Sequence, residues 1–588
     1  MMQRLSIVAV GFTLEIAEIL VILLSAMYIF VHFMDRENTK VFIQAIARQV
    51  SSFFGNDEAA SLKVWEAVSL LLGGDDCSDV FKTSNGNLFH DGCDLHKALA
   101  NLNEKELRRK KEGVFYTLPD VTNFIAANAF VKYISQETGG VLSPGDAAAL
   151  LAASSNKDKC KLLDASVFDP TCGAGEFLVS AIALKLGLFK GAMTDEKVMA
   201  LARSICGNDI APDSVAISKV RVFFSLVHYL SDINLFVPLA TTINNNFSVV
   251  DFIEPDLSIF KTYDIIIGNP PYIEYRMIGY KPVETYGNVY ANVLSNSSKM
   301  IAADGVMGFV IPISYVATKR MSKIRDLVYG QFPNVCLLNY ADRPDCLFAG
   351  VHQKLTILIA SKMSAHNGTF SSSYNYWYKN ERPMLFDNIQ LSQVDVMDTC
   401  IPKLGNNMEL SVFSKCLASA FENNLYGSAT AVQSGERNSV YLNMRNCFWI
   451  KAFSFNPGSS EYKHFVYSRN VVDFVRCVLN SSLFFFFWVA VSDCWHITAK
   501  ELLMFRLPRL DGVDTAIFTQ LFMELEGRLE ETKVYVGTKQ TEYEYKHKLC
   551  KDIIDKIDDA IAPIYGLTNL ETEYIKSYIL KYRMSDAA

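Results

Sequence analysis

The tetrapeptide Asn269-Pro270-Pro271-Tyr272 gives the most specific indication of chemistry in this sequence. It follows the apolar run 265–267, which is typical of a short buried strand, and Gly268, which permits a sharp turn. The two prolines fix φ and remove two backbone donors, so the loop presents acceptors. An asparagine carboxamide and a backbone carbonyl beside an aromatic ring suit a planar heterocycle with an exocyclic amine. A proline-rich turn after a core strand is the alternative.

Upstream segments follow the order expected of strands that end at one ligand site. Residues 165–178 predict a strand ending at Asp169, a glycine-rich turn and an apolar helix, whose N-terminus offers free N–H groups. A second strand ends at Asp209, where a carboxylate suits a ribose diol. A third ends at Asp251-Phe252, an acid and a ring suited to an adenine. Because each feature follows a strand, they are expected to meet at one edge of a sheet.

With these motifs, the chain resembles the amino-group DNA methyltransferases, specifically the N6-adenine enzymes of restriction-modification systems. The resemblance is firm over residues 105–360 and looser after them. It implies a Rossmann-like α/β core that depends on S-adenosylmethionine, with an N-terminal helical segment and a C-terminal α+β target-recognition domain. Residues 112–119 resemble the segment that closes over the methionine end of this cofactor. Asn288 stands where many relatives carry Asp.

The resemblance also assigns roles to individual residues. The cofactor residues that it implies are Tyr116, Thr117, Asp169, Pro170, Gly173, Gly175, Phe177, Asp209, Asp251, Phe252 and Asn269. The catalytic residues that it implies are Asn269, Pro270, Pro271 and Tyr272. Tyr272 is expected to stack on an adenine swung out of double-stranded DNA, because a paired amine cannot reach the cofactor. Methyl transfer from a sulfonium needs no metal, and none is expected.

Overall charge limits how this chain would contact DNA. With a net charge of −7 and a pI near 5.8, contact must come from local basic patches, of which residues 108–111 are one candidate. A solvated helix face is the alternative for that run. The 13 cysteines have no zinc-type spacing and indicate buried small residues in a reducing cytoplasm.

The N-terminus carries an apolar run at residues 16–34, long enough for a transmembrane helix. A membrane tether, a buried helix and a natural start at Met34 all fit this run. The domains expected are a hydrophobic segment (1–33), a helical region (34–112), the catalytic domain (113–362), the recognition domain (363–525) and C-terminal helices (526–588). Runs 41–47 and 62–72 predict helices.

After residue 362 the composition changes. Residues 361–376 are rich in Ser, Asn and Gly and predict a linker or loop. Aromatic runs at 447–453 and 483–488 favour short β-structure, and residues 549–581 predict helices. The polar candidates for DNA contact are His496, Thr498, Lys500, Lys451 and Arg469.

Three functions are compatible with these motifs. The favoured one is an adenine-specific DNA methyltransferase in a restriction-modification or phage-defence system, with a nuclease or other defence subunits as partners. A methyltransferase for RNA or a protein glutamine is the second, although such chains usually lack the large region after 362. The third is a non-catalytic DNA-binding subunit. Residues 34–105 show no acidic pair followed by Glu-x-Lys, so cleavage by this chain alone is not expected.

Overall fold

The computed structural model divides the described chain into two compact units. Unit 1 comprises the chain up to Ile311 together with Lys323–Val335 and Ile357–Asn367, and unit 2 comprises Pro312–Ser322, Cys336–Thr356 and the chain from Gly368. The described residues are 58–72, 117–189, 193–348, 351–418, 421, 423–429, 438–538 and 541–585. The apolar run 16–34, the predicted helix at 41–47 and the basic run 108–111 lie outside them.

A nine-stranded, mostly parallel sheet has the order β3-β2-β1-β4-β5-β7-β6-β8-β9. Its strands are β1 (Val167–Asp169), β2 (Ile205–Asp209), β3 (Phe247–Val249), β4 (Tyr263–Gly268), β5 (Ile301–Pro312), β6 (Asn334–Tyr340), β7 (Leu355–Ser361), β8 (Gly368–Asn375) and β9 (Ser392–Gln393). The pairs β3–β2, β2–β1, β1–β4 and β4–β5 are parallel. This arrangement confirms the predicted Rossmann-like α/β class.

Central strands are buried, as parallel strands covered by helices must be. Ile265, Ile266 and Ile267 of β4 are each 0% exposed, and Val167 of β1 pairs with Ile265. Because both faces of β4 are covered, its side chains form a continuous apolar run instead of an alternating one. The predicted strand at 265–267 is therefore confirmed.

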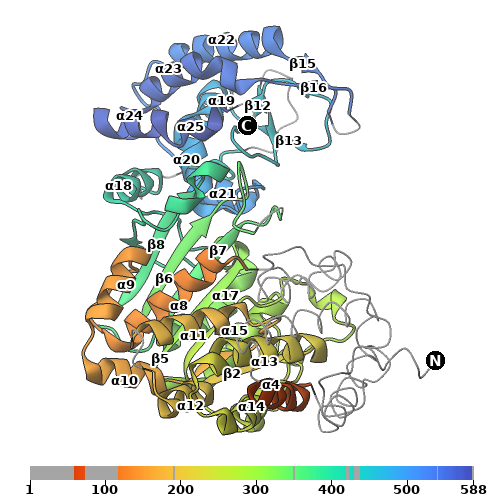
Figure 1. Ribbon diagram of the computed structural model, residues 1–588. Coiled ribbons are helices and arrows are strands. Elements are labelled where there is room, and N and C mark those ends of the chain that lie inside the picture. The colour runs from red at the N-terminus through yellow and green to blue at the C-terminus, as the bar shows by residue number, and fades with distance from the viewer. Residues whose placement is uncertain are drawn as a thin grey trace, which may run out of the picture. The chain divides into compact units, whose positions relative to one another are not determined.

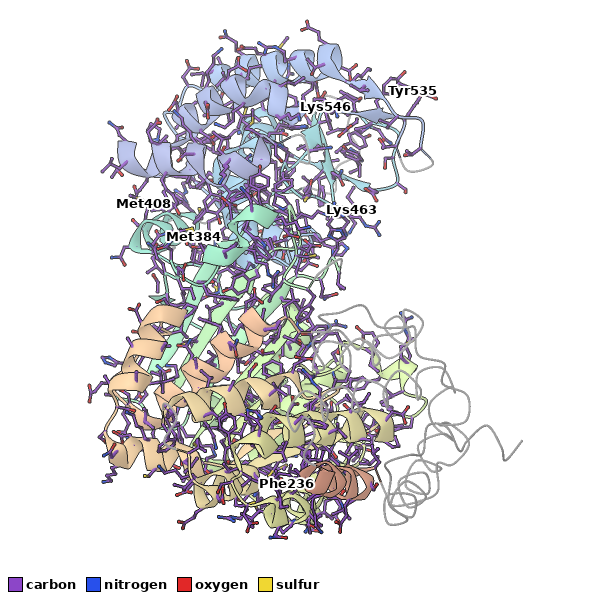
Figure 2. The ribbon with its side chains drawn as sticks, viewed as in Figure 1. Phe236, Met384, Met408, Lys463, Tyr535 and Lys546 are labelled. Atoms are coloured by element: carbon purple, nitrogen blue, oxygen red, sulfur yellow. The ribbon has the colours of Figure 1, made fainter. Side chains whose placement is uncertain are left out.

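Helices of unit 1 pack on this sheet and on each other (Figure 1). Helix α8 packs on α11 and β4, α11 also packs on β1, and α13 packs on β2 and β3. Phe236, at the start of α14 and labelled in Figure 2, is 1% exposed. The helices are α4 (Glu58–Leu71), α8 (Pro119–Ile134), α9 (Pro144–Ala153), α10 (Asn156–Asp164), α11 (Glu176–Gly187), α12 (Asp195–Ser204), α13 (Pro212–Leu226), α14 (Phe236–Asn245), α15 (Val289–Met300) and α17 (Ser322–Gln331). Helix α4 confirms the predicted helix at 62–72.

Unit 2 combines small antiparallel sheets with helices. Strand β11 lies between β12 and β13, while β10 pairs with β14 and β15 with β16. These strands are β10 (Asn423–Asn424), β11 (Ser439–Asn443), β12 (Ala452–Phe453), β13 (Tyr462–Val466), β14 (Arg506–Leu507), β15 (Val534–Tyr535) and β16 (Tyr543–Glu544). The helices are α16 (Ser314–Ala317), α18 (Asn407–Cys416), α19 (Val472–Asn480), α20 (Ser482–Val491), α21 (Ala499–Met504), α22 (Ala516–Thr532), α23 (Lys551–Ile561), α24 (Asn569–Ser577) and α25 (Leu580–Arg583). Helices α23 to α25 confirm the predicted helical end.

Two predictions for this half of the chain are wrong. Residues 361–376 contain strand β8, because its small polar side chains are hydrogen-bonded inside the sheet. The Asn339 side-chain amide donates to Ser371 Oγ at 3.1 Å, and the Asn339 backbone N–H donates to Ser372 Oγ at 2.9 Å. Residues 483–488 lie in helix α20, which Ser481 caps by accepting from the Phe484 N–H at 3.1 Å. Burial on all sides of α20 overrides the β-propensity of phenylalanine.

The expected boundaries at 362/363 and 525/526 remain predictions. The change of unit at Gly368 lies near the first of them, and residues 526–585 pack within unit 2. Among the described helices, none alone has the length and apolarity to span a membrane. Helices α19 and α20 meet those criteria only as a pair, bent by 63°, and both are buried.

Candidate active site

The predicted site residues of unit 1 meet at the carboxyl edge of the sheet. Asp209 is the last residue of β2, Asp169 the last of β1, and Asn269 directly follows β4. Asp251 lies two residues beyond β3. Because these four strands are parallel neighbours, their ends place the three acids and the tetrapeptide at one edge.

The glycine-rich turn after β1 is fastened to β2 by hydrogen bonds. Cys172 N–H donates to the Asn208 carbonyl at 2.7 Å, and Gly173 N–H donates to Asp209 Oδ2 at 2.9 Å. Gly175 has φ +85°, and a Cβ there would lie 2.4 Å from Ser218 Oγ on α13. Glycine is therefore required, because α13 approaches the turn too closely for a side chain.

Arg221 of α13 ties the turn to the start of α11. Its guanidinium donates to the Ala174 carbonyl and to Glu176 Oε1, both at 2.6 Å, and the residue is 2% exposed. Ser218 and Arg221 stand three residues apart, on one face of α13. Neither residue was predicted from the sequence, because a Ser and an Arg three residues apart on a helix carry no specific signal.

Asp169 is buried between neighbouring strands. It is 1% exposed, accepts the Thr171 N–H on Oδ1 at 3.0 Å, and a Cβ on Gly268 would lie 2.7 Å from the same oxygen. Burial, followed by the nearby Asp209 carboxylate, raises the pKa of Asp169 well above its usual range. Asp169 thus joins the ends of β1 and β4 and shapes the turn.

Asp209 and Asp251 each accept a local N–H in the same way. Asp209 Oδ1 accepts from Ala211 N–H and Asp251 Oδ1 from Ile253 N–H, both at 2.9 Å. Asp251 Oδ2 also accepts the Tyr280 hydroxyl at 2.6 Å. A carboxylate has about four lone-pair positions, which is more than the hydrogen bonds named here for either acid. Tyr280, in the loop after the tetrapeptide, was not predicted.

Two aromatic residues predicted at the cofactor lie in the core. Phe252 is 3% exposed, with its ring centroid 5.8 Å from Phe168 and 5.5 Å from Phe260. Phe177, in the first turn of α11, is 2% exposed. Both rings pack in the core next to the sheet edge. Their direct contact with a cofactor remains a prediction. Pro170 is also buried, and Tyr116 lies outside the described residues.

Asn269 is oriented by the segment that begins α8. Its amide nitrogen donates to Thr117 Oγ1 at 3.0 Å, and Thr117 is 3% exposed. Pro119 opens α8, where its missing N–H removes no helical bond. The contact joins residues 152 positions apart in sequence, and it sets the rotation of the carboxamide. Pro270 is buried, whereas Asn269 and Pro271 are half-buried.

Tyr272 is anchored at its hydroxyl end. The hydroxyl donates to the Val310 carbonyl at 2.9 Å, and the ring lies edge-on to Tyr290 at 6.5 Å. Burial raises its pKa well above the usual range, while the residue as a whole is half-buried. The phenol is therefore held at its tip with part of the ring accessible, and stacking on a base remains a prediction.

The polar candidates in unit 2 divide by their contacts. Lys500 Nζ donates to the Ala317 and Val491 carbonyls at 2.6 and 2.7 Å, and Thr498 caps α21, so both have structural roles. His496 pairs with Asp493 at 2.8 Å. Arg469 is exposed and Lys451 half-buried.

Together, the strand order and the glycine turn define the fold of an S-adenosylmethionine-dependent methyltransferase. Within it, residues 203–334 match the family described as the Eco57I restriction-modification methylases. The matched segment includes β2 to β5 and the Asn-Pro-Pro-Tyr loop.

Three known proteins illustrate the likeness. A putative type II restriction enzyme and methyltransferase of Methanocaldococcus jannaschii is 28% identical over 106 residues, which are 17% of this chain and 9% of that protein. The type IIL restriction-modification enzyme MmeI, solved in complex with DNA, shares the fold with a TM-score of 0.51, 12% identity, and coverage of 97% of this chain and 99% of that one. The type IIG endonuclease BpuSI aligns with a TM-score of 0.42 at 12% identity, over 92% of this chain and 76% of its own. The chain spans less than a tenth of the curated relative that it matches.

Proposed function

We propose that this chain is a site-specific DNA methyltransferase that transfers a methyl group from S-adenosylmethionine to the N6 amine of an adenine in DNA. The observation that carries the proposal is the Asn269–Thr117 contact at the sheet edge that also holds Asp169, Asp209 and Asp251. The proposed setting is a restriction-modification or related defence system in the cytoplasm, with double-stranded DNA and a nuclease or other defence subunits as partners.

The donor set at the sheet edge fits S-adenosylmethionine. Asp209 suits the ribose diol, and Asp251 with Phe252 suits the adenine. The glycine turn keeps side chains away from the ligand path, since Gly173 and Gly175 both have positive φ. Thr117, Asp169 and Pro170 border the end nearest the tetrapeptide, next to the position proposed for Tyr116. The cofactor supplies the methyl group on a cationic sulfur.

Asn269 and Pro270 would make the amine nucleophilic. The adenine amine is a weak nucleophile because its lone pair is delocalised into the ring. Asn269 Oδ1 and the Pro270 carbonyl would accept its two hydrogens, which favours the pyramidal nitrogen that attacks the methyl carbon. A neutral amide accepts without the desolvation penalty of a carboxylate. Pro271 stiffens the loop, and Tyr272 would stack on the extruded base.

Nucleoside mass spectrometry tests this function. DNA would be taken from cells that lack adenine methylation and express either the wild-type chain or Asn269→Ala. We expect N6-methyladenine with the wild type and none with the variant, while the purified variant still binds S-adenosylmethionine. The same analysis of RNA, and of protein for methylglutamine, covers the alternative acceptors. Methylation there and none in DNA would overturn the proposal, as would methylated adenine from the Asn269→Ala variant.

A further inference from the structure

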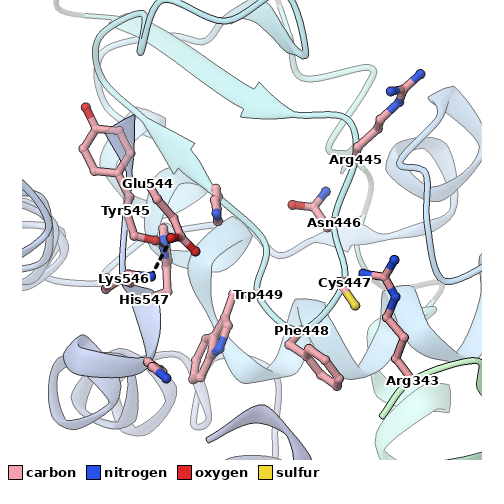
Figure 3. Close-up of a pocket in the computed structure, with 12 residues that line it drawn as sticks. Arg343, Arg445, Asn446, Cys447, Phe448, Trp449, Glu544, Tyr545, Lys546 and His547 are labelled. Carbon is pink, nitrogen blue, oxygen red and sulfur yellow. Dashed lines mark hydrogen bonds and ion pairs between the residues drawn. The ribbon is translucent and has the colours of Figure 1, made fainter. Parts of the chain in front are cut away.

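Unit 2 contains a cavity whose charged lining residues are mostly cations. Its volume is about 240 Å³, and Figure 3 shows the side chains around it. The lining comes from the loop between β11 and β12, from the end of β16 into the following turn, and from Arg343 beyond β6. The lining residues with charge are Arg343, Arg445, Lys451, Lys546, Lys548 and Glu544.

At neutral pH this lining carries a strong net positive charge, because five of its groups are cations and one is a carboxylate. Lys546 pairs with Glu544, and Arg445 pairs with Glu461 at 3.1 Å. His547 also borders the cavity but contributes no charge, since burial and the nearby Lys451 lower its pKa to about 3. The cavity therefore contrasts with a chain whose net charge is −7.

Lys451 is the informative member of this cluster. It is half-buried, and burial lowers its pKa. In the part of the chain that the structure describes, no hydrogen bond or ion pair engages its ammonium group. An ammonium group that is partly desolvated and makes no direct hydrogen bond or ion pair of its own can donate to an anionic ligand.

The aromatic residues of the cavity limit what that ligand can be. Trp449 and Tyr545 are 8% and 6% exposed. The Arg583 guanidinium lies 3.9 Å from the Trp449 ring centroid, and Phe453 lies 4.6 Å from the Tyr545 ring. Because both side chains are almost fully buried, neither ring offers a stacking platform for a base. Its exposed chemistry is that of ammonium and guanidinium groups.

We infer that this cavity binds a phosphate group. Lysine and arginine side chains on a concave surface are the donors that phosphate oxygens prefer. Resting on the proposed function, the source of the phosphate is the DNA backbone. Such a contact positions the duplex without reading its sequence. Arg343 and Arg445 of the lining are exposed, and Lys451 is half-buried.

The test compares Lys451→Met and Arg343→Gln with the control Lys556→Met. Lys556 is an exposed lysine of α23, also in unit 2, that pairs with Glu524 outside the cavity. Binding of a double-stranded oligonucleotide to the full chain is measured by fluorescence anisotropy over a range of salt. We expect each cavity variant to weaken binding several-fold and to reduce the slope of log Kd against log salt by about one. The control leaves affinity and slope at the wild-type values.

Two further readouts separate the explanations. Lys451→Met should keep or raise the melting temperature, because it removes a partly desolvated ammonium group. A fall in melting temperature that accompanies weaker binding means a structural role and overturns the inference. Titration with inorganic pyrophosphate shows whether the bound phosphate group belongs to DNA or to a free phosphorylated molecule. Weaker pyrophosphate binding with unchanged DNA binding keeps the phosphate site but assigns it to a free phosphorylated molecule. Cavity variants that match Lys556→Met with both probes overturn the site.

This test does not depend on catalysis. Loss of DNA affinity in the cavity variants, with no methylated adenine from the wild type, would leave the phosphate site intact and reject the proposed function. Methylation of adenine by the wild type, with cavity variants that bind DNA like the control, would support the proposed function and reject the phosphate site.

Discussion

Individual side chains at the sheet edge have two roles, since they fasten the turns and also present oxygens to a ligand. Asp209 is the clearest example, because its two oxygens accept from Gly173 N–H and Ala211 N–H, each at 2.9 Å. The same carboxylate thus fixes the glycine turn on β2 and faces the proposed ribose site. Its removal would affect both roles.

For Asp209→Ala we expect the Kd for S-adenosylmethionine, measured by calorimetry, to rise roughly ten- to hundredfold, because a lost buried hydrogen bond costs about 1–3 kcal/mol. The matched control is Asp232→Ala, which removes a carboxylate that accepts a turn N–H (Asn234, 2.9 Å) away from the site. Unchanged affinity in Asp209→Ala would show that the cofactor is placed wrongly.

The shape of the site depends on close contacts between secondary-structure elements and the loops that follow the strands. The turn between β1 and α11 touches α13 at Gly175, and the loop after β4 reaches back to Asp251 through Tyr280. These contacts are between elements far apart in sequence, and each has its own consequence for binding.

Gly175→Ala should weaken S-adenosylmethionine binding at least tenfold. The new Cβ would lie 2.4 Å from Ser218 Oγ at φ +85°, so the turn must move, and the left-handed backbone alone costs alanine roughly 1–2 kcal/mol. Gly187→Ala, at the other end of α11, is the control, because a Cβ there has no neighbour within 4 Å. Equal affinities for the two variants would contradict the role given to the turn.

Tyr280→Phe tests the loop that follows the tetrapeptide. Its hydroxyl occupies Asp251 Oδ2 at 2.6 Å, and this oxygen is the proposed acceptor for the cofactor adenine. Removing the competing donor should tighten S-adenosylmethionine binding about two- to tenfold, the value of one exchanged hydrogen bond. Weaker binding in this variant would mean that Tyr280 supports the cofactor site and does not compete for it. Fluorescence or calorimetric titration distinguishes these results.

At the scale of the whole molecule, positively charged groups and a buried histidine gather in one part of an acidic chain. The chain is acidic overall, yet unit 2 holds a basic cavity and a buried imidazole beside it. In Figure 2, Lys463 and Lys546 both belong to this unit, but only Lys546 lines the cavity. The stability of unit 2 should therefore respond to acid in a defined way.

His547 supplies that pH dependence. Burial and then Lys451 lower its pKa from 6.5 to about 3. As the pH falls, the unfolded chain takes up this proton first, so the stabilisation is complete above about pH 6.5 and declines toward pH 3. The loss of stability over this whole pH range corresponds to roughly 5 kcal/mol.

Urea unfolding at pH 7.5 and pH 4.5 measures the effect. Trp377, Trp449, Trp488 and Trp495 all lie in unit 2, so tryptophan fluorescence mainly follows that unit. The loss of stability between the two pH values should be smaller in His547→Gln than in the wild type. An equal loss in both proteins would exclude this histidine as the cause.

Local chemistry was readable from the sequence. Gly268 and the two prolines fix the tetrapeptide loop by backbone sterics alone. Asp169 and Asp209 end β1 and β2, Asp251 follows β3, and the apolar residues of these strands specify them. The methyltransferase fold and its ordered carboxyl ends were therefore predictable, because strand, turn and helix signals are encoded within short stretches of chain.

Tertiary structure decided what depends on distant partners. Strand β8 was mistaken for a loop because its serines are satisfied by Asn339, and helix α20 was mistaken for β-structure because burial outweighs propensity. The Thr117–Asn269 and Tyr280–Asp251 bonds, and the cluster around Lys451, join segments that no local pattern connects. Short-range sterics and periodicity specify elements, whereas side-chain contacts across a folded chain exist only once those elements have packed.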